Sequence, residues 1–332
     1  MISRVIITGG AGFIGSHIVD KLVNEGIDEI RVIDNLSSGD LENLKSHINK
    51  KYFRFIKYDL KKFDKDLIQA LRDADIVFHF AANPEVRVSS INPRIHFDEN
   101  ILATFNVLEA SRIADVDIHV FASSSTVYGE ANVIPTPEDY YPLEPISVYG
   151  AAKLACEILY ITYSKLYGFK PLILRYANII GPRSNHGVII DFIRKLKRNP
   201  SKLEILGDGT QRKSYLHVYD AVDATLYTLK YFLSHRKGYE IYNVGNDDWI
   251  TVKEIADIVV EALGLENVEY EYVLTTPDGR GWPGDVKFML LDISKLKKIG
   301  WKPSMTSYEA VEKTARYIVE KELFNEKHIP LY

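Results

Sequence analysis

The feature that most constrains the fold is a glycine-rich stretch near the start of the chain, Thr-Gly-Gly-Ala-Gly-Phe-Ile-Gly-Ser at residues 8–16. It follows the β-branched run 5–7 and opens a segment whose apolar residues recur at helical spacing. A strand, a tight turn and a helix start are therefore predicted in direct succession. Glycines let the backbone approach phosphates closely, and the free N–H groups of a first helical turn attract negative charge. The stretch predicts a binding site for a dinucleotide pyrophosphate.

An acidic residue ends the next predicted strand. Residues 30–33 are Ile-Arg-Val-Ile, and Asp34 follows them directly. A carboxylate at this place accepts hydrogen bonds from the adenosine ribose hydroxyls and repels a 2′-phosphate, so NAD is favoured over NADP. The next loop, 35–39, is small and polar and is suited to wrapping the adenosine.

Strands and helices alternate through the first half of the chain. We expect strands at 52–56, 76–80, 118–122 and 172–174, and helices at 64–71, 93–114 and 148–167. This alternation predicts an α/β fold of the Rossmann type, a doubly wound parallel sheet covered by helices on both faces. Beyond residue 177 the alternation fades. We therefore expect a first domain at 1–176 and a smaller mixed α/β substrate domain at 177–332, with 219–244 as the segment that could pack back on the first.

Composition limits the range of partners. A formal net charge of −4 gives no reason to expect a nucleic acid or an anionic membrane as partner. The basic stretch 194–198 is interrupted by Leu196 and is interpreted as a solvated helix face. No signal peptide and no apolar run of about 20 residues is evident, and Cys156 is the only cysteine, so a cytoplasmic protein is expected. The histidines lack metal-ligand spacing, and His79, inside a predicted strand, is interpreted as a core residue.

A second group of residues points to chemistry. Tyr149 and Lys153 lie four apart on a predicted helix, so their side chains share one face, and Ser124 ends a predicted strand. A free tyrosine titrates near about 10 and is a poor base at neutral pH. A nearby ammonium group, together with the positive charge of an oxidised nicotinamide, favours the phenolate. We therefore expect Tyr149 to act as the base, with Ser124 binding or relaying the proton of the same substrate hydroxyl.

These motifs and several later ones carry a family resemblance. The chain resembles the sugar-nucleotide epimerase/dehydratase group of the extended short-chain dehydrogenases/reductases, and within it the UDP-glucose (UDP-galactose) 4-epimerases. The segments that carry the resemblance are 8–16, 34–39, 79–82, 123–129, 149–153, 174–178, 207–211 and 283–285. They occur in the expected order over nearly the whole chain.

The resemblance implies an NAD site and no metal site. The residues that it implies for NAD are Gly9, Gly12, Phe13, Ile14, Gly15, Asp34, Asn35, Ser37, Ser38, Gly39, Asp59, Leu60, Ala81, Ala82, Asn83, Asn100, Ser123, Tyr149, Lys153 and Tyr176. Those that it implies for the nucleotide sugar are Ser124, Thr126, Tyr149, Asn178, Arg212, Lys213, Arg280, Asp285 and Met289.

The chain departs from the family pattern where the substrate diphosphate is expected. Lys213 aligns with a family arginine that meets the nucleotide phosphates, and Arg212 stands beside it. Trp282 stands where the family has an arginine two residues before Gly-Asp, and Arg280 lies two residues earlier. Met289 aligns with a position where tyrosine excludes N-acetyl sugars and small residues admit them. Methionine is intermediate and flexible, so this specificity stays open, and Met289 could equally be a core residue of a strand at 288–291.

The reaction implied by the resemblance is inversion at C4 of a UDP-hexose. Tyr149 takes the proton of the C4 hydroxyl while NAD accepts the C4 hydride, the 4-keto sugar turns in the pocket, and the hydride returns to the opposite face. UDP-N-acetylglucosamine and UDP-glucuronate 4-epimerases are the alternatives within the group. Sugar-nucleotide 4,6-dehydratases carry an Asp-Glu pair where this chain has Ser125 and Thr126, which disfavours dehydration.

An alternative of another class is a non-catalytic NAD-binding sensor or interaction module, since fold does not fix function. The pair Tyr149 and Lys153, with Ser124, favours an enzyme. Helices 93–114 and 148–167 resemble those that build the family's dimer, so a homodimer is expected.

Overall fold

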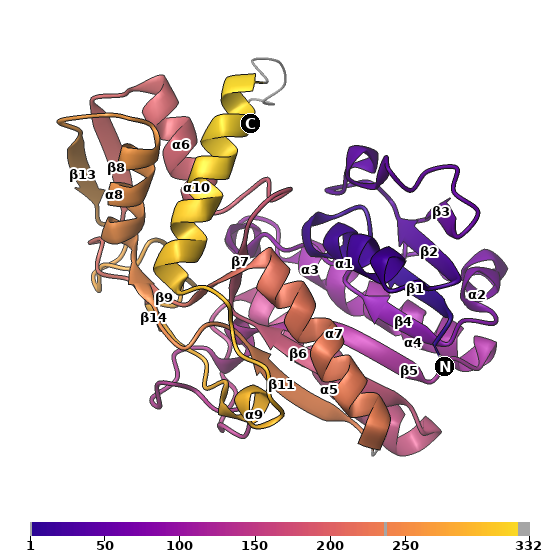
Figure 1. Ribbon diagram of the computed structural model, residues 1–332. Helices are drawn as coiled ribbons and strands as arrows, with labels where there is room; N and C mark the ends of the chain where they lie inside the picture. Colours follow the sequence, from indigo (N-terminus) through magenta and orange to yellow (C-terminus); the bar gives the residue numbers. More distant parts are fainter. Residues whose placement is uncertain (1, 236–237, 325–332) are drawn as a thin grey trace.

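The structure is a computed structural model that describes residues 2–235 and 238–324 (Figure 1). Its main sheet has seven parallel strands in the order β11-β6-β5-β4-β1-β2-β3. These strands are β1 (Arg4–Thr8), β2 (Glu29–Asp34), β3 (Phe53–Lys57), β4 (Ile76–His79), β5 (Ile118–Ser124), β6 (Lys170–Tyr176) and β11 (Glu240–Val244). The chain winds outward from β1 to β3 and then crosses to β4 on the other side of β1. The predicted doubly wound α/β fold is therefore confirmed.

Helices cover both faces of the main sheet because successive strand residues point to opposite sides. Val5 and Ile7 of β1 pack with α1 (Phe13–Asn24) and α7 (Val218–His235), whereas Ile6 packs with α2 (Lys65–Leu71) and α4 (Ala103–Ala114). Further along that second face, α5 (Val148–Tyr167) packs on Phe121 and Ile173. Nearly every β1 position is buried, as a parallel sheet with two covered faces requires.

The edge strand β11 comes from far along the chain. It pairs in parallel with β6 from Glu240↔Leu172 to Val244↔Tyr176, after α7 has crossed the sheet. Residues 219–244, for which a return to the first domain was expected, thus form most of α7 and the whole of β11. Just beyond the end of β6, β7 (Asn178–Ile180) pairs with β10 (Tyr215–His217).

A smaller part of the molecule has its own apolar core. It is built by α6 (Val188–Arg198), α8 (Val252–Ala262) and α10 (Ser307–Phe324) together with β8 (Lys202–Leu206) and β13 (Glu269–Val273), as Figure 1 shows. A short sheet in the order β12-β9-β14 joins Ile250–Thr251, Arg212–Lys213 and Phe288–Met289, and α9 spans Ser294–Lys298. Because β11 belongs to the main sheet, the domain boundary at residue 177 stays a proposal.

The helix expected at 93–114 is continuous but not uniform. It consists of α3 (Arg94–His96), a π-helical segment Phe97–Leu102 and α4. The Asn100 carbonyl accepts hydrogen bonds from the Thr104 hydroxyl at 2.6 Å and the Cys156 thiol at 3.4 Å. Side-chain donors that insert into the helical ladder widen it in this way, and helical periodicity alone does not reveal them.

Two polar features can be compared with the structural roles predicted for them. His79 is buried in β4, with Nδ1 2.7 Å from Thr8 Oγ1 and Nε2 2.9 Å from Thr104 Oγ1, so it is a satisfied core residue. In the basic stretch 194–198 on α6, residues 197–198 are exposed and Lys195 pairs with Asp191 and Glu204, as a solvated face predicts, but Arg194 departs from that prediction because it lines the cavity described below. In the described part of the chain, no helix combines the length and the apolar character that crossing a membrane requires.

Candidate active site

A cavity of about 600 Å³ opens where β1, β2, β4, β5 and β6 end. Its other side is closed by α6, by Lys213 of β9 and by residues 281–289. Parallel strands end at one edge of a sheet, so residues distant in the sequence meet there. The predicted site residues that line the cavity are Gly9, Gly12, Phe13, Ile14, Gly15, Asp34, Asn35, Ser37, Ser38, Asp59, Leu60, Ala81, Ala82, Ser123, Ser124, Thr126, Tyr149, Lys153, Tyr176, Asn178, Lys213, Asp285 and Met289.

The glycine turn is packed so tightly that side chains cannot be accommodated. Gly9 has φ +68°, and a Cβ there would lie 2.6 Å from the Ala81 backbone nitrogen. A Cβ on Gly12 would lie 3.1 Å from the Gly9 carbonyl oxygen, and one on Gly15 would overlap that oxygen. Gly12 caps α1 without a side-chain hydrogen bond, so the first N–H groups of the helix are open to an anion. This geometry fits the pyrophosphate of NAD.

Asp34 both faces the cavity and holds the turn. Its Oδ2 accepts from the Ala11 N–H at 3.0 Å and its Oδ1 from the Leu36 N–H at 2.8 Å. Burial raises the pKa of the carboxyl, and the two backbone hydrogen bonds oppose that shift. The sequence predicted the contact with the ribose but not this second role, which appears only when β1 and β2 lie side by side.

Three predicted NAD residues lie behind the cavity wall rather than in it. Gly39 packs on Ala11 and on Asp34 Oδ2. The Asn83 backbone N–H donates to Asn100 Oδ1 at 2.7 Å, and Asn100 Nδ2 donates back to the Asn83 carbonyl at 3.2 Å. The pair Asn83 and Asn100 braces the segment that carries Ala81 and Ala82.

The three predicted catalytic residues come together at the cavity. Ser124 ends β5, and its Oγ accepts from the Thr126 hydroxyl at 3.0 Å; it lines the cavity together with Tyr149. Lys153, one helical turn after Tyr149 on α5, places Nζ 5.9 Å from the centre of the tyrosine ring and donates to the Ala122 carbonyl at 2.8 Å. Ser147 caps this helix by accepting from the Gly150 N–H at 3.1 Å, which positions Tyr149 in the first turn.

Burial dominates the electrostatics of this pair. It raises the pKa of Tyr149 to about 12, against the lowering effect of the nearby Ser124 side chain. It also lowers the pKa of Lys153 to about 8. The direction for tyrosine is opposite to the shift that the sequence predicted, because desolvation outweighs an ammonium group that is not in direct contact with the phenol. The protein residues alone therefore do not make Tyr149 a base at neutral pH.

A buried ion pair lies directly beneath the site. Glu157 follows Lys153 by one helical turn, and its carboxylate accepts from the Ser123 hydroxyl and, at 2.7 Å, from Nη2 of Arg175 on β6. Arg175 also donates to the Tyr128 hydroxyl at 2.9 Å and the Glu138 carbonyl at 3.0 Å. Sequence reasoning missed this pair, although residues 149, 153 and 157 recur every fourth position on one helix face.

Sequence reasoning also missed a second neighbour of Tyr149. The buried ring of His96 packs edge-on against the Tyr149 ring, with 5.6 Å between the ring centres. No spacing signal could have found it, because the two residues come from different helices.

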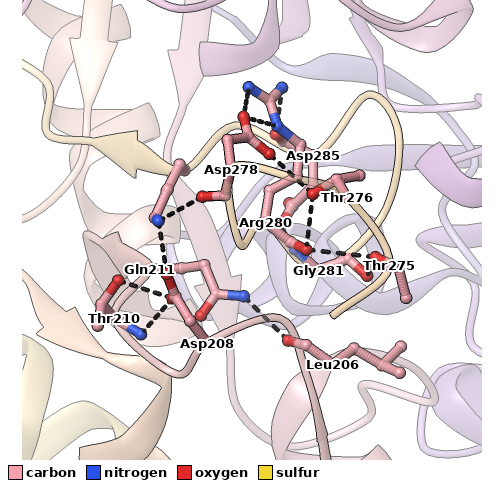
Figure 2. A network of polar contacts seen from close by, with 11 residues as sticks. Leu206, Asp208, Thr210, Gln211, Thr275, Thr276, Asp278, Arg280, Gly281 and Asp285 are labelled. Carbon is pink, nitrogen blue, oxygen red and sulfur yellow. Dashed lines mark hydrogen bonds and ion pairs between the residues drawn. The ribbon is translucent and has the colours of Figure 1, made fainter. Parts of the chain in front are cut away.

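Two arginines predicted to bind substrate do not reach the cavity. Side chains alternate along a strand, so Lys213 of β9 faces the cavity whereas Arg212 is exposed and lies over the Trp249 ring. Arg280 is held by Asp278 and Glu130 and donates to the Asp285 carbonyl at 3.2 Å. Figure 2 shows Arg280 turned toward Asp278 within this polar network.

Met289 belongs to the core and also lies at the cavity wall. It is buried in β14 among Val127, Ala177 and Leu291, and it also lines the cavity. A flexible side chain at this wall can adapt its shape to the sugar.

The fold, the glycine turn and the Tyr149–Lys153 pair define an NAD-dependent α/β enzyme of the short-chain dehydrogenase/reductase type. A model of the NAD dependent epimerase/dehydratase family matches residues 5–245, and the chain belongs to that family.

The proteins similar to this chain include enzymes with several different named activities. A putative UDP-glucose 4-epimerase of Methanocaldococcus jannaschii is 38% identical over 321 residues, which cover 95% of this chain and 98% of the relative. A solved UDP-galactose 4-epimerase is 51% identical with a TM-score of 0.85, covering 96% of this chain and 99% of that one. A UDP-glucuronic acid 4-epimerase from Bacillus cereus, solved with UDP-glucuronic acid and NAD, is 28% identical with a TM-score of 0.85 and covers 96% and 99% of the two chains. The chain is thus a nucleotide-sugar epimerase/dehydratase.

Proposed function

We propose that this protein is an NAD-dependent 4-epimerase that interconverts UDP-glucose and UDP-galactose. The observation that carries the proposal is the cluster of Ser124, Tyr149 and Lys153 in the same cavity as the glycine turn. The identity of 51% to a solved UDP-galactose 4-epimerase supports the choice of substrate. Ser125 and Thr126 line the cavity where the related dehydratases place an acid pair, which favours epimerisation over loss of water.

Different residues of the chain bind the cofactor and act on the sugar hydroxyl. The glycine turn and Asp34 hold NAD, which supplies a reversible two-electron acceptor at the sugar C4. Tyr149 Oη takes the proton of the C4 hydroxyl and later returns it. Ser124 Oγ, which accepts from the Thr126 hydroxyl and lines the same cavity as Tyr149, orients that hydroxyl. Lys153 and the oxidised nicotinamide together supply the positive charge that offsets the burial of the phenol.

Proton NMR of purified protein with NAD and UDP-glucose tests this function. We expect a signal of the galacto epimer to grow until the two sugars reach equilibrium. Parallel samples with UDP-N-acetylglucosamine and UDP-glucuronate show whether the cavity, whose wall includes Met289, accepts either of these sugars as a substrate. If NAD binds but none of the three sugars changes, the proposal of a 4-epimerase for these sugars fails, and another nucleotide sugar or a dehydrogenase reaction takes its place.

We also propose that the protein is a homodimer that buries α4 and α5. These helices pack together, yet Phe105, Ile113, Ile158 and Leu166 on them are exposed by 43%, 48%, 54% and 66%. An apolar surface of this kind is typical of an interface. Light scattering should give twice the chain mass of 37.9 kDa, and Ile158→Glu should shift the mass toward the monomer. A wild-type mass of one chain at micromolar concentration would contradict the proposal.

A further inference from the structure

The wall of the cavity opposite the glycine turn contains an indole with an unusual setting. Trp282 lines the cavity, and its Nε1 is buried without a hydrogen-bond partner in the part of the chain that the structure describes. A buried N–H that lacks an acceptor costs free energy, so it is a site where an acceptor on a ligand would be favoured. This residue replaces the arginine that the family resemblance predicts.

Two cations lie against the same indole. The Cζ atom of Arg87 lies over the Trp282 ring, 4.3 Å from its centre, and Nζ of Lys213 lies 5.5 Å from it. Arg87 comes from the short 3-10 helix Val86–Ser90 after β4, whereas Lys213 comes from β9. Both cations line the cavity. Trp282 therefore contacts one cation from the segment after β4 of the main sheet and a second cation from β9 of the short sheet.

The two cations differ in their partners. Lys213 is paired with Asp285 at 2.5 Å, which neutralises much of its charge. For the Arg87 guanidinium, the ring of Trp282 is the contact that the structure gives, and no hydrogen bond or ion pair is found for it within residues 2–235 and 238–324. A guanidinium over an aromatic face keeps its N–H donors at its edge, where they can bind phosphate oxygens in pairs.

We propose that Arg87, stacked on Trp282, is a ligand of the substrate diphosphate and acts together with Lys213. This inference rests on the proposed function, because the anion is the diphosphate of a nucleotide sugar. Arg212 and Arg280 do not place a guanidinium group in the cavity. In this proposal Arg87 supplies that group from the segment after β4, on the opposite side. The Trp282 N–H is a further donor toward the same anion. The substrate bridges the two parts of the molecule through this group.

Calorimetric titration of UDP into the NAD-loaded protein tests the assignment, with Arg87→Gln as the variant. We expect the Kd of UDP to rise on the order of 10- to 100-fold, the effect of losing charge-assisted hydrogen bonds to an anion. Arg87→Lys should recover only part of the affinity, because lysine is a point charge without the planar fork. Arg94→Gln is the matched control, since Arg94 is 77% exposed, lies over the Phe97 ring and is absent from the cavity wall.

The outcomes separate this inference from the proposed function. A Kd for Arg87→Gln within twofold of the wild-type value, or a wild-type protein that binds no UDP at millimolar concentration, overturns the inference. Epimerisation with an unchanged KM in Arg87→Gln also overturns it while leaving the proposed function intact. A loss of UDP affinity in Arg87→Gln without epimerisation by the wild type supports the diphosphate site and rejects the 4-epimerase. NAD content, read from absorbance, should be the same in all variants because Arg87 is not among the residues assigned to NAD.

Discussion

Tyr149→Phe is expected to lower kcat by about 100- to 10,000-fold, the usual contribution of a positioned acid/base group. The ring and its packing against His96 are kept, while the oxygen that exchanges the proton of the C4 hydroxyl is lost. The fold and the NAD site should persist, because the glycine turn and Asp34 do not contact this hydroxyl. The measurement is turnover of UDP-glucose by proton NMR, with NAD content determined on the same sample.

Tyr141→Phe is the matched control for this variant. Tyr141 is 86% exposed, so the same loss of a hydroxyl should leave turnover unchanged. Near-normal kcat in Tyr149→Phe would contradict the role of Tyr149 as acid and base. A low kcat with lost NAD would instead point to misfolding, which the absorbance reading detects.

Glu157→Gln is expected to lower the thermal midpoint of unfolding by roughly 5 °C. Glu157 and Arg175 have side-chain exposures of 1% and 3%, so the variant leaves a guanidinium buried without its counter-charge. Removing one partner of a buried pair costs about 3–5 kcal/mol, and each kcal/mol corresponds to roughly 1–2 °C in a chain of this size. Calorimetry or circular dichroism gives the midpoint.

A surface pair provides the comparison for Glu157. Glu312 and Arg316 form an ion pair one helical turn apart, with side-chain exposures of 38% and 52%, so Glu312→Gln should cost less than about 1 kcal/mol. If the two variants unfold at the same temperature, the buried pair Glu157–Arg175 stabilises the protein no more than the surface pair does. Because Glu157 also accepts from the Ser123 hydroxyl, a second expected effect is weaker turnover at temperatures where the variant is folded.

Several features of the site follow from local sequence. The run 8–16 predicted a strand, a turn and a helix, and the structure has β1, the glycine turn and α1 there. The helix expected at 148–167 is α5 with those bounds. Spacing of four on that helix places Tyr149 and Lys153 on one face whatever the rest of the chain does. Such predictions succeed because glycine conformations, helical periodicity and strand ends are decided by neighbouring residues.

Other features depend on which elements become neighbours. Arg212 and Lys213 are adjacent in the sequence, and only the pairing of β9 with β12 and β14 decides which of them faces the cavity. The pKa of Tyr149 rises rather than falls because its desolvation depends on every element packed around it. Arg87 reaches Trp282 only when the segment after β4 meets a loop almost two hundred positions later in the chain.

The sequence by itself determined the dinucleotide turn, the acidic residue that ends β2 and the tyrosine–lysine pair, because each is encoded within one or two adjacent elements. The tertiary structure alone decided the return of β11 to the main sheet, the buried Glu157–Arg175 pair and the cations beside Trp282. Burial and charge are properties of the whole packed molecule. A linear pattern can name a charged side chain, but only the fold decides whether it meets solvent, a counter-ion or the ligand.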